Sequence, residues 1–246
     1  MNLPHDWSVG LPYDSISGEG CVAFLQGGIG WYSKSFPTTI SANQKCYIVF
    51  DGVYNNSEYW INGKKLGYHL SGYAPFYFDV TDYLNPNEDN RMTVRVDHSH
   101  YADSRWYTGS GIYRDVKMIV TDRLHIPVWG TFVTTPVVTD KYAKVNNQIT
   151  VRNSYSEPRT AVVEIVYKDN KGNIAAFEVF SIKLNAGEEK IIDIVSEIKQ
   201  PDLWSVEIPV SIQPRPVLRM AMKSFLKTLS GSVYEHSTLM QTKVSP

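Results

Sequence analysis

The sequence has little cysteine, no long apolar run and almost no net charge, and each absence excludes a class of protein. Two cysteines, Cys21 and Cys46, are too few for a disulfide framework, and both lie in strand-like runs that favour small buried hydrophobic residues. No apolar run approaches the length of a membrane span. The formal net charge of -1, from 24 basic and 25 acidic residues, gives no basic surface for nucleic acid or anionic lipid. We therefore expect neither nucleic acid nor a membrane as a partner.

A secretory signal peptide is also missing, because the chain opens MNLPHDW with no basic region before an apolar stretch. A cytoplasmic location is the default expectation. A periplasmic or secreted location follows instead if the true start lies upstream.

Aromatic residues are abundant, at 13% of the chain with 16 Tyr and 6 Trp. Tyr and Trp join an apolar ring face to a polar tip, so an excess of them favours sugar-facing or interface surfaces. The alternative is packing alone, since β-rich proteins use many aromatic residues. A chain of 246 residues is long enough for one large domain or two ordinary ones.

Apolar and polar residues alternate with a period of two along the first half of the chain, which predicts strands. Asn62-Gly63 between two such runs predicts a two-residue hairpin, because both residues tolerate the positive φ of a type I′ turn. Residues 81–90 are typical of one helical turn followed by a polar loop. Many short strands separated by turns predict a jelly roll or a related sandwich. The predicted strands are 30–36, 45–51, 54–61, 76–80, 91–97 and 112–120.

A second series of alternating runs follows residue 123, and the polar turn at 169–173 is the clearest break in it. Five to seven strands in about 90 residues match the size of an immunoglobulin-like sandwich. We therefore predict an all-β chain, with a jelly-roll β-sandwich at 1–122 and an immunoglobulin-like β-sandwich at 123–212.

The tail, residues 213–246, has a different composition. Its alternation stops, Pro214 and Pro216 interrupt any continuing strand, and residues 220–229 are compatible with a basic amphipathic helix. We predict that the tail lies outside the sandwich, either as a divergent linker or as the product of an altered reading frame. Its charged residues are Arg215, Arg219, Lys223, Lys227 and Lys243 against Glu235.

No catalytic residue can be nominated from the pattern. Glu188 and Glu189 begin an alternating run, so their side chains point to opposite faces, and no G-x-S-x-G nucleophile motif is present. His98 and His100 lie two apart on a predicted strand and share a face, but the sequence offers them no third ligand. We predict no metal and no cofactor.

Chemistry-bearing side chains are densest at 103–114, DSRWYTGSGIYR. Asp103, Arg105 and Trp106 stand beside two glycines that allow the backbone to turn closely. Carboxylate oxygens accept hydroxyl protons and aromatic faces cover sugar C–H groups, so the cluster is suited to a sugar site. A purely structural corner, with Trp106 filling the core, is the alternative.

Long motifs occur in order at 3–7 (LPHDW), 30–36 (GWYSKSF), 50–84, 103–116 (DSRWYTGSGIYRDV) and 201–207 (PDLWSVE). Together they resemble glycoside hydrolase family 2, which includes β-galactosidases, β-glucuronidases and β-mannosidases. The resemblance implies an N-terminal jelly-roll sugar-binding domain, an immunoglobulin-like sandwich and then a TIM barrel that carries the two catalytic glutamates. Neither glutamate motif of that barrel is found in this sequence.

The resemblance also implies site residues. Asp103 matches a residue that hydrogen-bonds the terminal sugar, while Arg105 and Trp106 match the same motif and shape the loop. His98 and Tyr101 lie on the approach to it. We therefore expect the non-catalytic portion of a β-galactosidase-like enzyme, which contributes carbohydrate binding to the hydrolysis of terminal β-glycosides. The alternatives are a free-standing carbohydrate-binding or adhesion module, and a fragment complemented by a separate barrel or second subunit.

Overall fold

The computed structural model describes residues 2–16, 20–100, 105–169 and 171–207, with the backbone alone at 213–220 and 237–238. The chain divides into two compact units. Unit 1 takes residues 1–120 with 234–246, and unit 2 takes residues 121–233. Both units consist of antiparallel strands, and the described residues add only short 3-10 helices. The predicted all-β class, with one β-sandwich after another, is confirmed.

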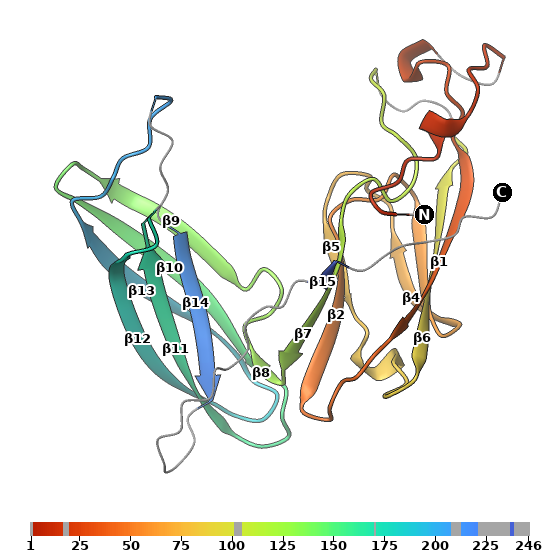
Figure 1. Ribbon diagram of the computed structural model, residues 1–246. Helices are drawn as coiled ribbons and strands as arrows, with labels where there is room; N and C mark the ends of the chain where they lie inside the picture. The colour runs from red at the N-terminus through yellow and green to blue at the C-terminus, as the bar shows by residue number, and fades with distance from the viewer. Residues whose placement is uncertain are drawn as a thin grey trace. The chain divides into compact units, whose positions relative to one another are not determined.

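Unit 1 is built from two four-stranded sheets (Figure 1). The first has the order β1 (Gly28–Pro37), β6 (Asp89–His98), β3 (Ser57–Ile61) and β4 (Lys64–His69). The second has the order β15 (Ser237–Thr238), β7 (Val116–Asp122), β2 (Gln44–Phe50) and β5 (Phe76–Asp79). Apolar side chains from both sheets form one buried cluster, so the two sheets pack face to face.

The strands of unit 1 follow the period of two in the sequence. Along β6, Met92, Val94 and Val96 are buried while the residues between them are more exposed. Asn62 and Gly63 have φ values of +50° and +78°, which confirms the predicted turn between β3 and β4. The predicted helical turn is also confirmed, as the 3-10 helix η3 (Thr81–Tyr83).

Three expectations for unit 1 differ from the structure. Cys46 is buried in β2 as expected, whereas Cys21 is exposed in the 3-10 helix η2 (Gly20–Val22). No strand forms there because Ala23 and Phe24 adopt φ values of +58° and +57°, which interrupt an extended chain. The strands predicted at 54–61 and 112–120 begin later, at Ser57 and Val116, because Tyr54 forms an isolated bridge with Gly111 instead.

Unit 2 is also built from two sheets. One has the order β13 (Glu189–Lys199), β10 (Tyr142–Asn153) and β8 (Leu124–His125), and β9 (Thr131–Val138) also pairs with β10. The other has the order β12 (Ile174–Leu184), β11 (Arg159–Lys168) and β14 (Gln213–Met220). Every second residue of β10 and β11 is buried, and the apolar ones among them contribute most of the second core, together with side chains such as Leu124, Leu184 and Ile198.

Unit 2 also buries a polar contact within its core. The hydroxyl of Tyr167 accepts from Nδ2 of Asn147 and donates to Oγ of Ser196 over 2.9 Å, which links β11 to β10 and β13. All three residues are at most 1% exposed, so each depends on the others for its hydrogen bonds.

The start of the tail is part of unit 2. The sequence predicts that the chain from residue 213 is separate from the sandwich, whereas Gln213–Met220 form β14 and pair with β11 along eight positions. The prolines fit because β14 is the last strand of its sheet, where a residue without an N–H is tolerated. Pro214 and Pro216 lie two apart, so their backbone nitrogens point to the same side of the strand. The helix predicted at 220–229 lies largely outside the described residues.

Candidate functional site

The candidate site lies at one end of the unit 1 sandwich, here called the loop end. It comprises residues 5–8, 54–56, 69–73, 97–100 and 105–113. Hydrogen bonds join these segments to one another although they are far apart in the sequence. His5 N donates to Ile112 O over 2.8 Å, Tyr54 and Gly111 exchange two bonds of 2.9 Å, and Tyr113 Oη donates to Gly72 O over 2.7 Å.

The structure brings two of the predicted site residues to the surface of the loop end. Arg105 is exposed, and Trp106 is 60% exposed with its Nε1 donating to Oη of Tyr73 over 3.1 Å. Trp106 therefore does not fill the core, which contradicts the structural-corner alternative for this residue. Asp103 and Tyr101 lie outside the described residues.

His98, at the end of β6, contacts the loop at 105–113 through Ser110. Its Nδ1 lies 2.7 Å from Oγ of Ser110, and its ring meets the ring of Tyr54 edge-on at 4.9 Å. Oγ of Ser110 is in turn 2.6 Å from Oγ of Ser8, which donates to Gln26 O over 2.7 Å. His98 is thus one end of a chain of hydrogen bonds that runs through Ser110 and Ser8 to Gln26.

Asp6 is a central residue of the loop end that the sequence analysis does not single out. Its Oδ1 accepts from the backbone N–H groups of Ser8 and Ser110 over 3.0 and 2.9 Å, and its Oδ2 accepts from the hydroxyl of Tyr107. Only the LPHDW motif at 3–7 pointed to this position. No pattern in the sequence shows that its partner lies about a hundred residues away.

Glycines allow the backbone to approach closely at this end. Gly111 has a φ of +115°, and a Cβ on it would lie 2.1 Å from Oη of Tyr32. Gly109 has a φ of +75°, and a Cβ there would lie 2.9 Å from Oδ2 of Asp6. The two glycines of the predicted cluster are therefore required by the loop conformation, as the sequence suggested.

The surroundings of Tyr32, which contacts the loop end, and of Tyr107 raise the pKa of both phenols. Burial raises the pKa of Tyr32 to about 12. Burial, and then the hydrogen bond to Asp6 and its negative charge, raise the pKa of Tyr107 as well. The hydroxyl of Tyr107 donates to the carboxylate of Asp6, while that of Tyr32 accepts from the N–H of Ile112 over 3.4 Å.

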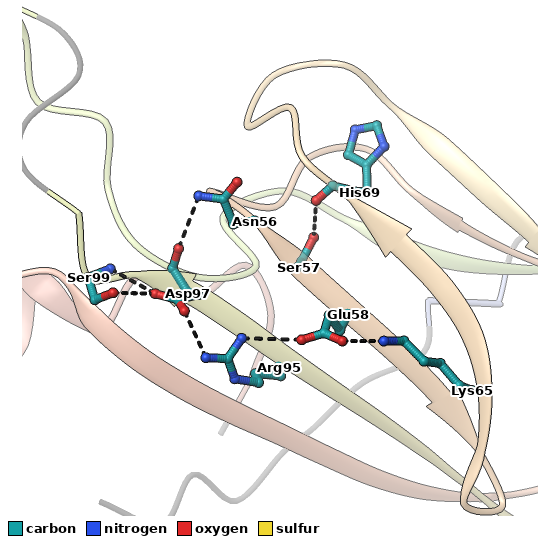
Figure 2. Close-up of polar contacts among 8 residues, drawn as sticks. All are labelled: Asn56, Ser57, Glu58, Lys65, His69, Arg95, Asp97 and Ser99. Atoms are coloured by element: carbon teal, nitrogen blue, oxygen red, sulfur yellow. Dashed lines mark hydrogen bonds and ion pairs between the residues drawn. The ribbon is translucent and has the colours of Figure 1, made fainter.

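A chain of charged groups leads along the outer face of the first sheet toward the loop end (Figure 2). Glu58 is contacted by Lys65 and by Arg95, and Nη2 of Arg95 donates to Oδ2 of Asp97 over 2.7 Å. Oδ1 of Asp97 then accepts from N and Oγ of Ser99 over 3.1 and 2.5 Å. The hydrogen bond from Lys65 lowers the pKa of Glu58, and the one from Ser99 lowers the pKa of Asp97.

The described residues contain no group of three or more His, Cys, Asp or Glu side chains arranged to hold a metal ion. His98 is the last residue of β6 and is hydrogen-bonded to Ser110, while His100 lies beyond the strand. Within the same residues, no helix is long and apolar enough to span a membrane.

What the loop end offers is a set of exposed ring faces beside hydrogen-bonding groups. Tyr73, Trp106 and Tyr107 are between 39% and 60% exposed, and all three take part in the hydrogen bonds described above. Rings of this kind bind the apolar faces of a ligand while their polar tips hydrogen-bond to it or to the protein. The arrangement suits a ligand with both C–H faces and hydroxyl groups.

Comparison with known families assigns both units. Residues 22–122 match the sugar binding domain of glycosyl hydrolases family 2, and residues 124–211 match a second domain of the same family. The chain belongs to glycosyl hydrolase family 2. Most of the loop end falls within the matched sugar-binding domain, whereas Asp6 precedes the match.

Relatives in family 2 include a β-galactosidase of Bacteroides ovatus, 39% identical over 212 residues, which are 85% of this chain and 25% of that protein. A β-glucuronidase of Formosa agariphila is 29% identical over 74% of this chain and 21% of its own length. A solved family 2 structure from Bacteroides cellulosilyticus superposes with a TM-score of 0.84 at 34% identity, covering 89% of this chain and 29% of that one. The chain spans about a quarter of the length of these relatives.

Proposed function

We propose that this chain supplies the carbohydrate-binding part of a family 2 glycoside hydrolase that acts on terminal β-glycosides, as the β-galactosidase relative does by its name. The observation that carries the proposal is the exposed Trp106–Tyr73–Tyr107 surface on the sugar-binding domain. Arg105 and Trp106 contribute to the proposed sugar site. Asp103 hydrogen-bonds the sugar, and Tyr101 and His98 support the approach to it.

Hydrolysis itself needs two carboxylates that flank the scissile bond. The resemblance assigns these to a barrel, which we propose as the partner of this chain, either in the same polypeptide or in a second subunit. The chain alone should therefore not hydrolyse a chromogenic β-galactoside. Steady hydrolysis that one glutamate substitution abolishes would contradict this division of labour.

The test of sugar binding is a titration of the ¹⁵N-labelled chain with methyl β-D-galactoside and methyl β-D-glucuronide, observed at the indole N–H cross-peaks. We expect the cross-peak of Trp106 to move with one of these sugars and that of Trp129, in unit 2, to stay fixed. Trp106→Ala should abolish binding, while Trp31→Ala, which removes an exposed Trp from β1, should not. Equal loss of binding in both variants, or no binding by the wild-type chain, would contradict the proposed site.

A further inference from the structure

The N-terminal segment pairs with the loop at 105–113 through its backbone on both sides of Asp6. His5 N donates to Ile112 O over 2.8 Å, and Trp7 N donates to Ser110 O over 3.1 Å. This pairing directs the carboxylate of Asp6 at the loop. One segment, distant in sequence, therefore lies alongside the loop and presents a charged acceptor to it.

The carboxylate uses both of its oxygens on that loop. Oδ1 takes the N–H of Ser110, and Oδ2 takes the hydroxyl of Tyr107, the residue next to Trp106. A Cβ at position 109 would lie 2.9 Å from Oδ2, so Gly109 allows the backbone to pass directly over the carboxylate. Hydrogen bonds to an ionised acceptor are about twice as strong as neutral ones, which makes this a firm attachment.

Two parts of the loop end are held differently. At the end of β6, Asp97 binds the N–H and hydroxyl of Ser99, only two residues away, and Arg95 donates to the same carboxylate (Figure 2). At the loop 105–113, Asp6 binds groups that are 101 and 104 residues away in sequence. Local contacts reform whenever the strand is folded, but the contact made by Asp6 has no local substitute.

We propose that Asp6 is a positioning residue for sugar binding, which orders the loop that presents Arg105 and Trp106. This rests on the proposed function, and it extends that function to a residue outside the cluster at 103–114. Without Asp6 the loop samples additional conformations. The apparent affinity for sugar then falls in proportion to the fraction of molecules that keep the binding conformation.

The experiment compares Asp6→Ala, Asp6→Asn and Tyr107→Phe in the full chain. Asp6→Ala should shift the indole cross-peak of Trp106 without shifting that of Trp60, and should raise the Kd for methyl β-D-galactoside about tenfold, the size expected when the competent state falls to about a tenth. Tyr107→Phe, which removes one hydroxyl and keeps the backbone pairing, should have a smaller effect in the same direction. Asp6→Asn retains an acceptor for Ser110 and should restore most of the affinity.

The melting temperature of unit 1 distinguishes positioning from general stability. A shifted Trp106 cross-peak and a loss of affinity in Asp6→Ala, with an unchanged melting temperature, support the proposal. An unchanged Trp106 cross-peak and unchanged Kd in both Asp6→Ala and Tyr107→Phe would overturn it. If the wild-type chain does not bind sugar, the proposed function fails, and the response of Trp106 to Asp6→Ala still decides whether Asp6 orders the loop.

Discussion

The loop end of unit 1 and two turns of unit 2 are held by different kinds of contact. In unit 1, Asp6 and Ser8 bind groups more than a hundred residues away. In unit 2, the turn between β11 and β12 is closed by Asp169, whose Oδ1 accepts from the N–H groups of Lys171 and Asn173 over 2.9 and 2.8 Å. The turn before β10 is closed in the same local way, by Thr139 and Tyr142.

This difference predicts how far the structural effect of a substitution should extend. A local turn depends on a few neighbouring residues, so a change there stays within the hairpin. The loop end depends on several segments at once, so one change there displaces all of them. Unit 2 also has a long-range polar contact in its core, at Asn147, Tyr167 and Ser196. Two pairs of substitutions and one acid titration examine this contrast.

The largest effect is expected from Gly111→Ala, with Gly172→Ala as its matched partner. Both glycines have positive φ, but a Cβ at 111 would lie 2.1 Å from Oη of Tyr32, whereas a Cβ at 172 has nothing within 4 Å. We expect Gly111→Ala to destabilise unit 1 by about 3 kcal/mol or more, from backbone strain and overpacking together. Gly172→Ala should cost unit 2 about 1 kcal/mol from backbone strain alone.

Urea unfolding followed at the indole cross-peaks of Trp60 and Trp129 reports the two units separately. The predicted difference between the two glycines would be contradicted if both variants lowered the stability of their own unit by the same amount. It would also be contradicted if Gly111→Ala left the cross-peak of Trp106 unmoved, because the strain would then not reach the loop.

A smaller effect is expected from Tyr167→Phe in unit 2, compared with Tyr59→Phe in unit 1. Loss of the Tyr167 hydroxyl leaves Asn147 and Ser196 buried without this partner, which should cost about 2 kcal/mol. The hydroxyl of Tyr59 donates to Oγ of Ser57 over 2.6 Å, and Ser57 keeps its own bond to His69 O. Tyr59→Phe should therefore cost about 1 kcal/mol.

Chemical denaturation of the two tyrosine variants gives this ranking directly. A larger loss of stability in Tyr59→Phe than in Tyr167→Phe would show that the hydrogen bonds of Tyr167 are not the main long-range polar contact of unit 2.

The smallest effect is expected from acid. The folded state lowers the pKa of Glu58 and Asp97, so their contribution to stability is present above about pH 4, the range of unfolded carboxyl groups, and is lost as the pH falls through the lowered values. Exposed ion pairs contribute little, so the slope should be shallow. Glu58→Gln should flatten the fall in the unit 1 unfolding midpoint between pH 5 and 3 relative to wild type. An identical fall in both proteins would exclude Glu58 as a source of the acid sensitivity.

Much of the fold could be predicted from the sequence because alternation and turn chemistry are local properties. The hairpin at Asn62-Gly63 is an example, since both residues take the positive φ that the turn requires. The exact start of β3 could not be predicted, because Tyr54 pairs with Gly111, which is remote in sequence. The strand at Gln213–Met220 was missed for a related reason, since prolines argue against a strand only when its place in the sheet is known.

The candidate site was partly predictable. The cluster at 103–114 singled out Arg105 and Trp106 as candidates without deciding between surface and core, and the structure finds both exposed. The glycines beside them were interpreted correctly as close-approach positions. Asp6 and Tyr73 were missed because each binds the loop at 105–113 from another segment of the chain. Contacts of that kind exist only after the sandwich has formed.

The prolines of β14 have a consequence for how the chain behaves at high concentration. The N–H groups of an edge strand that do not face its neighbour point outward and can recruit a strand from another molecule. Pro214 and Pro216 have no N–H, so neither residue can donate a hydrogen bond to a neighbouring strand on either side of β14. A second molecule therefore meets an incomplete template at this edge, and intermolecular sheet growth should begin elsewhere on the protein.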